Sequence, residues 1–211
     1  QEVSTYYHLA LLKKYLTDFP YLSYKHYFYG PKGGLVIFSR LPLEKNEYTD
    51  FSKQGSFTNS SFYTKFIKNG VLTCQLKDSS IILANTHLVT DFEFNLSKKS
   101  KVSSLVKRQT YEVGALINRL SQANKDIVVA GDFNSAKDNN LYTEFLQETN
   151  ATDLFATVTL PTYYINRISK YFQADRSAII DYIFLKSTSK KVIPISVSHL
   201  FNYRYTIGKG E

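Results

Sequence analysis

The chain has 211 residues, of which 43% are hydrophobic and 21% charged, so it can form one domain with a sizeable core. No run approaches the length of a transmembrane span, and the single cysteine, Cys74, excludes an intrachain disulfide. The net charge of +8 favours nucleic acid, phosphoinositides or an anionic membrane as partners, although many basic proteins bind none of these. Gln1 is not a natural start, so a signal peptide could precede it, and both a cytoplasmic and a secreted bacterial-type protein fit.

The apolar patterning predicts several helices and strands in chain order. Ser4 or Thr5 can cap a first helix, whose apolar residues recur at helical spacing: Leu9, Leu12 and Leu16. Further helices are expected over residues 103–122 and 141–148. Strands are expected over residues 24–29, 35–38, 63–67, 71–76, 81–84, 128–130, 179–184 and 192–197.

Turn residues separate these elements. The glycines within 30–34 predict a turn, and the polar residues 44–60 predict a loop. Asn69-Gly70 predicts a tight hairpin between the runs at 63–67 and 71–76. Since hairpins and helices alternate irregularly, we expect a mixed α and β fold around antiparallel or mixed sheets.

Polar side chains interrupt or end several of the predicted strands. His87 ends one strand, Asp132 and Asn134 end another, and Asp181 lies within an apolar run. Glu2 stands just before the first helix. We expect these groups to converge at one edge of a sheet sandwich, where sites form on a rigid scaffold.

Each of these residues also has a simpler interpretation. Glu2 would be a solvated charge of a first helical turn, and His87 a structural histidine. The stretch VVAGDFNS (128–135) would be a buried strand bounded by turn residues. Asp181 is harder to dismiss, because an unpaired buried carboxylate is costly and no partner for it is apparent in the sequence.

The residue types suit one chemistry. Glu and Asp are hard oxygen donors for Mg²⁺, which shares its remaining positions with water and phosphate. A zinc site is disfavoured, because there is one cysteine and the four histidines lack close ligand spacing. An amide and an imidazole can donate hydrogen bonds to phosphoryl oxygens as charge builds on them. The set therefore suits metal-assisted phosphoester hydrolysis.

The motifs resemble those of the endonuclease/exonuclease/phosphatase superfamily, which includes DNase I, abasic-site endonucleases, inositol polyphosphate 5-phosphatases and neutral sphingomyelinases. They follow in the family's order over nearly the whole chain: Gln1-Glu2, GGLVIFSRLPL (33–43), ANTHL (84–88), Arg108-Gln109, AGDFNS (130–135) and IIDYIF (179–184). The resemblance implies an α+β fold, a DNase I-like four-layered α/β/β/α sandwich with one site at the upper edge of its two sheets.

The resemblance also implies a role for each candidate residue. Glu2 would hold Mg²⁺, and His87 would contact the scissile phosphate and stabilise the pentavalent transition state. Asp132 would position the attacking water or assist the leaving group, and Asn134 would hydrogen-bond a phosphoryl oxygen. Asp181 would orient a catalytic histidine, which would be its missing partner.

Two parts of the family pattern are missing. The family has a strand ending in Asn before the Gln-Glu pair, and a Ser-Asp-His motif near its end; Ser196-Val197-Ser198-His199 is a poor match to the latter. We therefore expect that the domain over 1–211 lacks the first and last strands of a longer hydrolase. The 211-residue chain alone would then be catalytically impaired.

The motif variants bear on the substrate. His87 argues against the abasic-site endonuclease branch, and residues 68–72 resemble an element of sphingomyelinases. The leading hypothesis is a monomeric, Mg²⁺-dependent phosphodiesterase that cleaves a phospholipid headgroup and contacts the membrane peripherally. A DNase I-like nuclease and a non-catalytic lipid- or nucleic-acid-binding remnant are the alternatives. Aromatic stretches at 48–57 and 92–94 would either rest on lipid or pack on the sandwich.

Overall fold

The computed structural model describes residues 1–54, 68–90, 101–165, 176–188, 192–193 and 195–196. Its helices are α1 (Tyr6–Tyr15), the 3₁₀ turn η1 (Lys32–Gly34), α3 (Lys101–Ser121) and α4 (Asn140–Thr149). Its strands are β1 (Tyr21–Ser23), β2 (Ile37–Ser39), β3 (Leu43–Asp50), β4 (Gly70–Leu76), β5 (Ile81–His87), β6 (Asp126–Asp132), β7 (Thr152–Asp153) and β8 (Asp181–Lys186).

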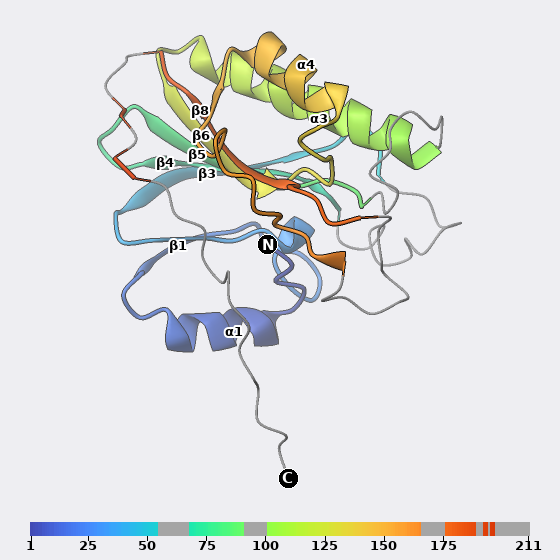
Figure 1. Cartoon of the computed structure of the whole chain (residues 1–211). Helices are drawn as coiled ribbons and strands as arrows, with labels where there is room; N and C mark the ends of the chain where they lie inside the picture. Colours follow the sequence, from blue (N-terminus) through green and yellow to red (C-terminus); the bar gives the residue numbers. More distant parts are fainter. Residues whose placement is uncertain (55–67, 91–100, 166–175, 189–191, 194, 197–211) are drawn as a thin grey trace.

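These elements form four layers. Six strands make one sheet in the order β3-β4-β5-β6-β8-β7, in which β5 and β6 are parallel and the other neighbours antiparallel. Helices α3 and α4 cover one face of this sheet, and the two-stranded β1-β2 sheet and then α1 lie on the other side (Figure 1). The expected α+β fold, a DNase I-like α/β/β/α sandwich, is confirmed, with two strands of the second sheet within the described residues.

The main core lies between the six-stranded sheet and its two helices. Side chains alternate along the central strands, so every second residue faces α3 and α4. The residues that these strands bury there are Ile82, Ala84, Ile127, Val129, Tyr182 and Phe184. The apolar stripe predicted on α3 is also confirmed: Val106, Val113, Leu116 and Ile117 are buried, and Leu120 packs against the cluster.

A much smaller core joins α1 to the rest. The Thr5 hydroxyl accepts a hydrogen bond from the His8 N–H at 3.2 Å, which confirms the predicted cap. Leu9 is buried with Val3 and Val36. Partly buried residues surround this cluster, so the layer depends on fewer apolar contacts than the main core.

Two predictions in the first half of the chain are wrong. The loop expected over 44–60 begins instead with β3, which is an edge strand among the described residues, pairs there with β4 alone and leaves most of its side chains exposed. An edge strand with a solvated face tolerates polar residues, so hydropathy does not reveal it. The strand expected over 24–29 is a loop with one isolated bridge, from His26 to Pro31, and the strand itself is the shorter β1.

Other boundaries shift. The strand expected at 35–38 is β2, which starts two residues later, and the one expected at 179–184 is β8, which starts at Asp181. Gly70 opens β4, which pairs with β3 and β5, whereas the expected hairpin partner at 63–67 lies outside the described residues. The described residues at 192–196 are not strand.

Two further properties agree with the composition. In the part of the chain that the structure describes, no helix is both long and apolar enough to cross a membrane. Cys74 is a buried free thiol on β4.

Candidate active site

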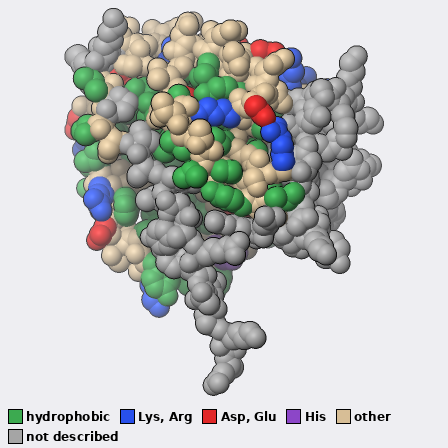
Figure 2. Space-filling model, in the orientation of Figure 1, with side chains coloured by type: hydrophobic (Ala, Val, Ile, Leu, Met, Phe, Trp, Pro, Cys, Tyr) green, Lys and Arg blue, Asp and Glu red, His purple; other side chains and the backbone are tan. Residues whose placement is uncertain are grey.

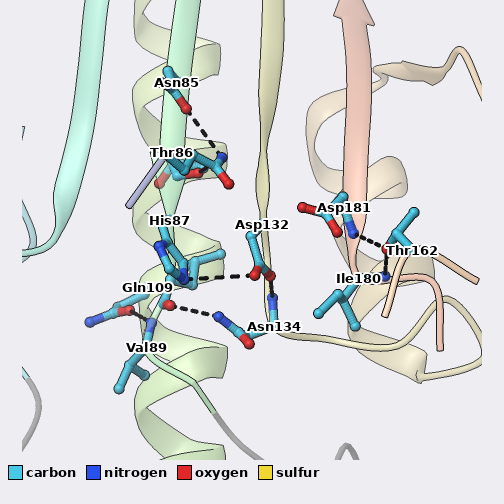
Figure 3. A network of polar contacts seen from close by, with 12 residues as sticks. Asn85, Thr86, His87, Val89, Gln109, Asp132, Asn134, Thr162, Ile180 and Asp181 are labelled. Carbon is cyan, nitrogen blue, oxygen red and sulfur yellow. Dashed lines mark hydrogen bonds and ion pairs between the residues drawn. The ribbon is translucent and has the colours of Figure 1, made fainter. Parts of the chain in front are cut away.

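Three of the candidate residues lie in one row across neighbouring strands. His87 on β5 pairs in register with Asp132 on β6, which pairs in register with Asp181 on β8 (Figure 3). Neighbouring strands are about 4.8 Å apart, so the row spans roughly the width of a phosphate group and its substituents. The register thus places an imidazole and two carboxylates at one edge of the sheet.

The three side chains also share one face of the sheet. Residues that precede or follow them on the same strands, Thr86 and Tyr182, are buried toward the opposite face. Asn85, two residues before His87, donates a hydrogen bond to the Val36 carbonyl at 3.1 Å. The row therefore faces the β1-β2 side of the sandwich, away from the main core.

His87 and Asp132 are close together, and burial disfavours the charged form of both side chains. Their Nε2 and Oδ2 atoms are 3.7 Å apart, and both side chains are mostly shielded from solvent. Burial lowers the pKa of His87 against the opposing pull of Glu2. Burial, and then the charge of Asp181, raise the pKa of Asp132 well above its ordinary value. The neutral imidazole is therefore the favoured form, ready to accept or donate a proton.

Asn134 fixes the turn that follows β6. Its backbone N–H donates to Asp132 Oδ1 at 2.7 Å, and its own φ of 46° is one that asparagine tolerates well. Its side-chain amide donates to the Leu88 carbonyl at 2.9 Å, and the Leu88 N–H donates to the Asp132 carbonyl at 2.9 Å. Asn134 thus ties the ends of β5 and β6 together.

Glu2 reaches the same edge from the N-terminal segment. The Gln1 side-chain amide donates to Thr86 O at 2.6 Å and to Asn85 Oδ1 at 3.2 Å, which docks the segment on β5. Glu2 is exposed and has a φ of 57°. Its charge acts to raise the pKa of both His87 and Asp132, after larger effects of burial. All five candidates therefore gather around one region.

The argument that Asp181 is a buried carboxylate is wrong. Asp181 opens β8 and is exposed, so no burial cost requires a partner for it. Its backbone is nevertheless fixed, because Thr162 Oγ1 accepts hydrogen bonds from the N–H groups of Ile180 and Asp181 at 3.0 and 3.1 Å (Figure 3). Thr162 was not among the predicted site residues, because it belongs to a loop without periodic patterning.

Gln109 on α3 supports the loops next to the candidate site through hydrogen bonds to their backbone, a role that was not predicted. Its side chain is fully buried on α3; it accepts a hydrogen bond from the Val89 N–H at 2.9 Å and donates to the Lys53 carbonyl at 3.1 Å. It therefore holds the loops that follow β5 and β3. The signal was present, since Gln109 is a polar residue on the apolar stripe between Val106 and Val113.

A cavity of about 160 Å³ adjoins the row at Asp181. Apolar side chains make most of its wall: Phe155, Val158, Leu160, Ile179 and Ile183. Hydrophobic side chains also gather in the middle of the face seen in Figure 2, where β8 and the described residues that follow β7 lie. Lys137 holds one wall, because its ammonium donates to the carbonyls of Phe155 and Ala156 at 3.1 and 2.7 Å.

The donor set fits Mg²⁺ held through few protein ligands. Among the described residues, no three His, Cys, Asp or Glu side chains stand close enough to form a complete metal cage. Mg²⁺ is usually bound through one or two carboxylates together with water and substrate phosphate. Burial is the main cause of the raised pKa of Asp132, and the charges of Asp181 and Glu2 raise it further. A cation at this edge would relieve that repulsion.

Comparison with known proteins agrees with this architecture. The model of the endonuclease/exonuclease/phosphatase family matches residues 1–202. The chain belongs to this family. Members of the family are hydrolases, and the row at the end of β5, β6 and β8 is this member's candidate active site. A search of curated proteins finds no match.

Solved structures share the fold at low sequence identity. Sphingomyelinase C from Streptomyces griseocarneus is 15% identical with a TM-score of 0.58, over 85% of this chain and 66% of that one. A β-hairpin deletion mutant of beta toxin from Staphylococcus aureus is 15% identical with a TM-score of 0.64, over 97% and 78%. TDP2 from D. rerio, complexed with a single-strand DNA product, is 13% identical with a TM-score of 0.57, over 92% and 72%. This family member thus spans about two thirds of the sphingomyelinase's length.

Proposed function

We propose that this protein is a Mg²⁺-dependent phosphodiester hydrolase that removes the headgroup of a phospholipid by in-line attack of water. The observation that carries the proposal is the row of His87, Asp132 and Asp181 on one face of three neighbouring strands, with Glu2 beside it. An imidazole, carboxylates and an amide at one edge of a sheet suit phosphoryl transfer better than other hydrolytic chemistry.

Each residue has a role in the proposal. His87, neutral because it is buried, would donate a hydrogen bond to a non-bridging oxygen of the phosphate as negative charge develops there. Asp132 would orient the attacking water or the leaving oxygen. Asn134 would hydrogen-bond a phosphoryl oxygen through the amide N–H that Leu88 does not engage, and it would also hold Asp132 in place. Asp181 would orient a histidine that acts as general base.

Glu2 would hold the metal ion. Mg²⁺, when bound, supplies positive charge that stabilises the phosphoryl oxygens. The hydrogen bonds from Gln1 to β5 would keep the Glu2 carboxylate at the edge where the phosphate binds. A change that frees this segment should therefore weaken metal-dependent turnover without disturbing the row itself.

Two observations favour a phospholipid over nucleic acid. An apolar cavity adjoins Asp181, and it could bind the acyl chains or an apolar headgroup of a substrate. Among the proteins with this fold is a sphingomyelinase C. The alternative is a nuclease, which the net charge of +8 favours because polyphosphate backbones attract basic proteins. TDP2 with its DNA product shares the fold too.

The test is an activity assay on the full-length protein. Sphingomyelin vesicles, phosphatidylcholine vesicles and plasmid DNA are each incubated with Mg²⁺ or with chelator. We expect headgroup release that requires Mg²⁺, and no nicking of the plasmid. Nicking alone would favour the nuclease, and neither activity would favour a non-catalytic binding module.

One substitution tests the site. We expect H87A to lower the turnover number by roughly 10²–10⁴-fold while folding normally, because His87 lies at the sheet edge outside the main core. The matched control is H8A, which removes an exposed histidine of α1 outside the row and should retain full turnover. Equal activity of the two variants would contradict the proposed role of His87.

A further inference from the structure

Three large aromatic side chains stand out in solvent near the N-terminal segment. The exposed fractions are 69% for Tyr7, 78% for Phe28 and 60% for Tyr29. We call these three residues the aromatic rim. Tyr7 and Tyr29 belong to neighbouring segments, because the Tyr6 N–H donates to the Tyr29 carbonyl at 2.8 Å.

The backbone beneath the aromatic rim is fixed. The Tyr6 hydroxyl donates to the Tyr27 carbonyl at 2.8 Å, and the Tyr27 N–H donates to the Gly30 carbonyl at 3.1 Å. Gly30 packs so closely on the N-terminal segment that a Cβ there would lie 2.6 Å from the Ser4 carbonyl oxygen. The loop therefore holds Phe28 and Tyr29 outward, although both could bury apolar surface if the loop collapsed.

The aromatic rim lies at the same edge of the molecule as the candidate active site. Ser4, on which Gly30 packs, is two residues after Glu2, and the Val3 N–H donates to the Gly34 carbonyl at 3.0 Å. In Figure 1 the loop that follows β1 lies beside the N-terminus, where the α1 layer meets the end of the sheet. A surface that contacts the rim would thus face the edge that carries Glu2 and His87.

Two lysines lie close to the aromatic rim. Helix α1 contains no acidic residue, and the Lys13 ammonium lies 6.0 Å from the ring centre of Tyr24, at the start of the rim's loop. Lys25, exposed in the rim's own loop, is the second. Lysines beside exposed tyrosine and phenylalanine are typical of segments that rest on phospholipid, with aromatic rings at the headgroup level and cations near the phosphates.

We propose that the aromatic rim is the surface by which this protein docks on a phospholipid bilayer. The inference rests on the proposed function in one respect, since it places the phosphate site against the bilayer that would hold the substrate. The aromatic stretch expected at 48–57 is a poorer candidate: Phe51 is buried, and the Tyr48 hydroxyl donates to the Lys68 carbonyl at 2.6 Å. The stretch at 92–94 lies outside the described residues.

The test measures binding without turnover. The full-length protein is sedimented in chelator with vesicles of phosphatidylcholine and sphingomyelin, with and without phosphatidylserine. The test variant is the double substitution F28S/Y29S, and the control is Y15S. Tyr15 is 72% exposed at the far end of α1, so Y15S removes an equally exposed ring outside the rim.

We expect F28S/Y29S to weaken vesicle binding by roughly tenfold or more, because two rings lose their apolar contact with the bilayer. Y15S should change binding by less than about twofold, and phosphatidylserine should strengthen binding of the wild type. Equal binding by wild type and F28S/Y29S would overturn the inference, as would self-association through the rim in solution that F28S/Y29S abolishes. Circular dichroism of both variants verifies that they are folded.

Failure of the docking surface and failure of the proposed function are distinguishable. Vesicle binding that depends on the rim, without any Mg²⁺-dependent hydrolysis, would support the inference and contradict the function. Hydrolysis of a soluble phosphodiester by F28S/Y29S at the wild-type rate, with loss of activity on vesicles alone, would support both. Full vesicle activity of F28S/Y29S would contradict the inference and leave the function standing.

Discussion

The two sides of the six-stranded sheet differ in how firmly they are packed. On the α3 and α4 side, aromatic rings meet edge to face in a large core; Phe133, for example, lies 5.3 Å from both Phe145 and Phe184. On the α1 side, the apolar cluster contains only three buried residues among those described, Val3, Leu9 and Val36. The candidate active site uses both sides, because the row belongs to the sheet whereas Glu2 belongs to the α1 layer.

This difference indicates that the two parts of the site have different local stabilities. The row would persist as long as the sheet is folded, whereas Glu2 would leave whenever the N-terminal segment detaches from β5. Metal binding would then be the part of the site most sensitive to mild destabilisation. Three measurements test these differences in stability.

The largest expected effect concerns the two cores. F145A should lower the free energy of unfolding by about 3–5 kcal/mol, since Phe145 is fully buried between α4 and the sheet. L9A, which truncates the α1 cluster, should cost about 2 kcal/mol, the low end for such a truncation, because its surroundings can collapse. Urea unfolding followed by circular dichroism compares them; a larger cost for L9A would reverse the assignment of the firm and weak sides.

A smaller effect is expected at two equivalent helix caps. Thr5 caps α1, and Asn139 caps α4 by accepting a hydrogen bond from the Leu141 N–H at 3.1 Å. T5A and N139A should each cost about 1 kcal/mol. Amide hydrogen exchange should locate the loss in α1 alone for T5A and throughout the main core for N139A. Faster exchange over the whole protein in both variants would show that the layers unfold together.

The smallest effect is a pH-dependent gain in stability. Because folding raises the pKa of Asp132, the unfolded chain binds fewer protons there than the folded chain, so stability falls as pH rises from the ordinary aspartate value of about 3.9 through the raised value. In chelator, D132N should therefore have a higher thermal midpoint than the wild type at neutral pH, and the difference should vanish below the ordinary value. D132N should also lack activity. A lower midpoint at neutral pH would contradict the predicted direction.

Prediction from sequence succeeded for elements with a repeating apolar pattern. It failed where the strand pairing or the burial of a single residue depends on its neighbours in the tertiary structure. The stripe on α3 and the strand ends at His87 and Asp132 follow from periodicity and turn residues, and both were located correctly. Strand β3 was missed because an edge strand needs no apolar alternation. Asp181 was correctly placed near a strand but wrongly taken as buried, since burial depends on the strand's start and on what covers it.

The supporting residues of the site show the same limit. Gln109 and Thr162 act through hydrogen bonds to backbone groups that are distant in sequence or lie in loops. A sequence shows that such a residue is polar in an apolar setting, but the identity of its partner requires the tertiary structure. The roles assigned to His87, Asp132, Asn134, Asp181 and Glu2 accordingly stay predictions that the assays above test.

The parallel pairing of β5 and β6 makes the separation of His87 and Asp132 independent of the chain between them. The two residues are the last register pair of β5 and β6. The loops within the 44 residues between them can therefore change in length without moving either side chain. Proteins with this scaffold can therefore change the loops between β5 and β6, and with them the substrates that they bind. The distance between the two candidate catalytic side chains stays the same. Loop grafts between relatives are therefore a practical way to redirect this protein.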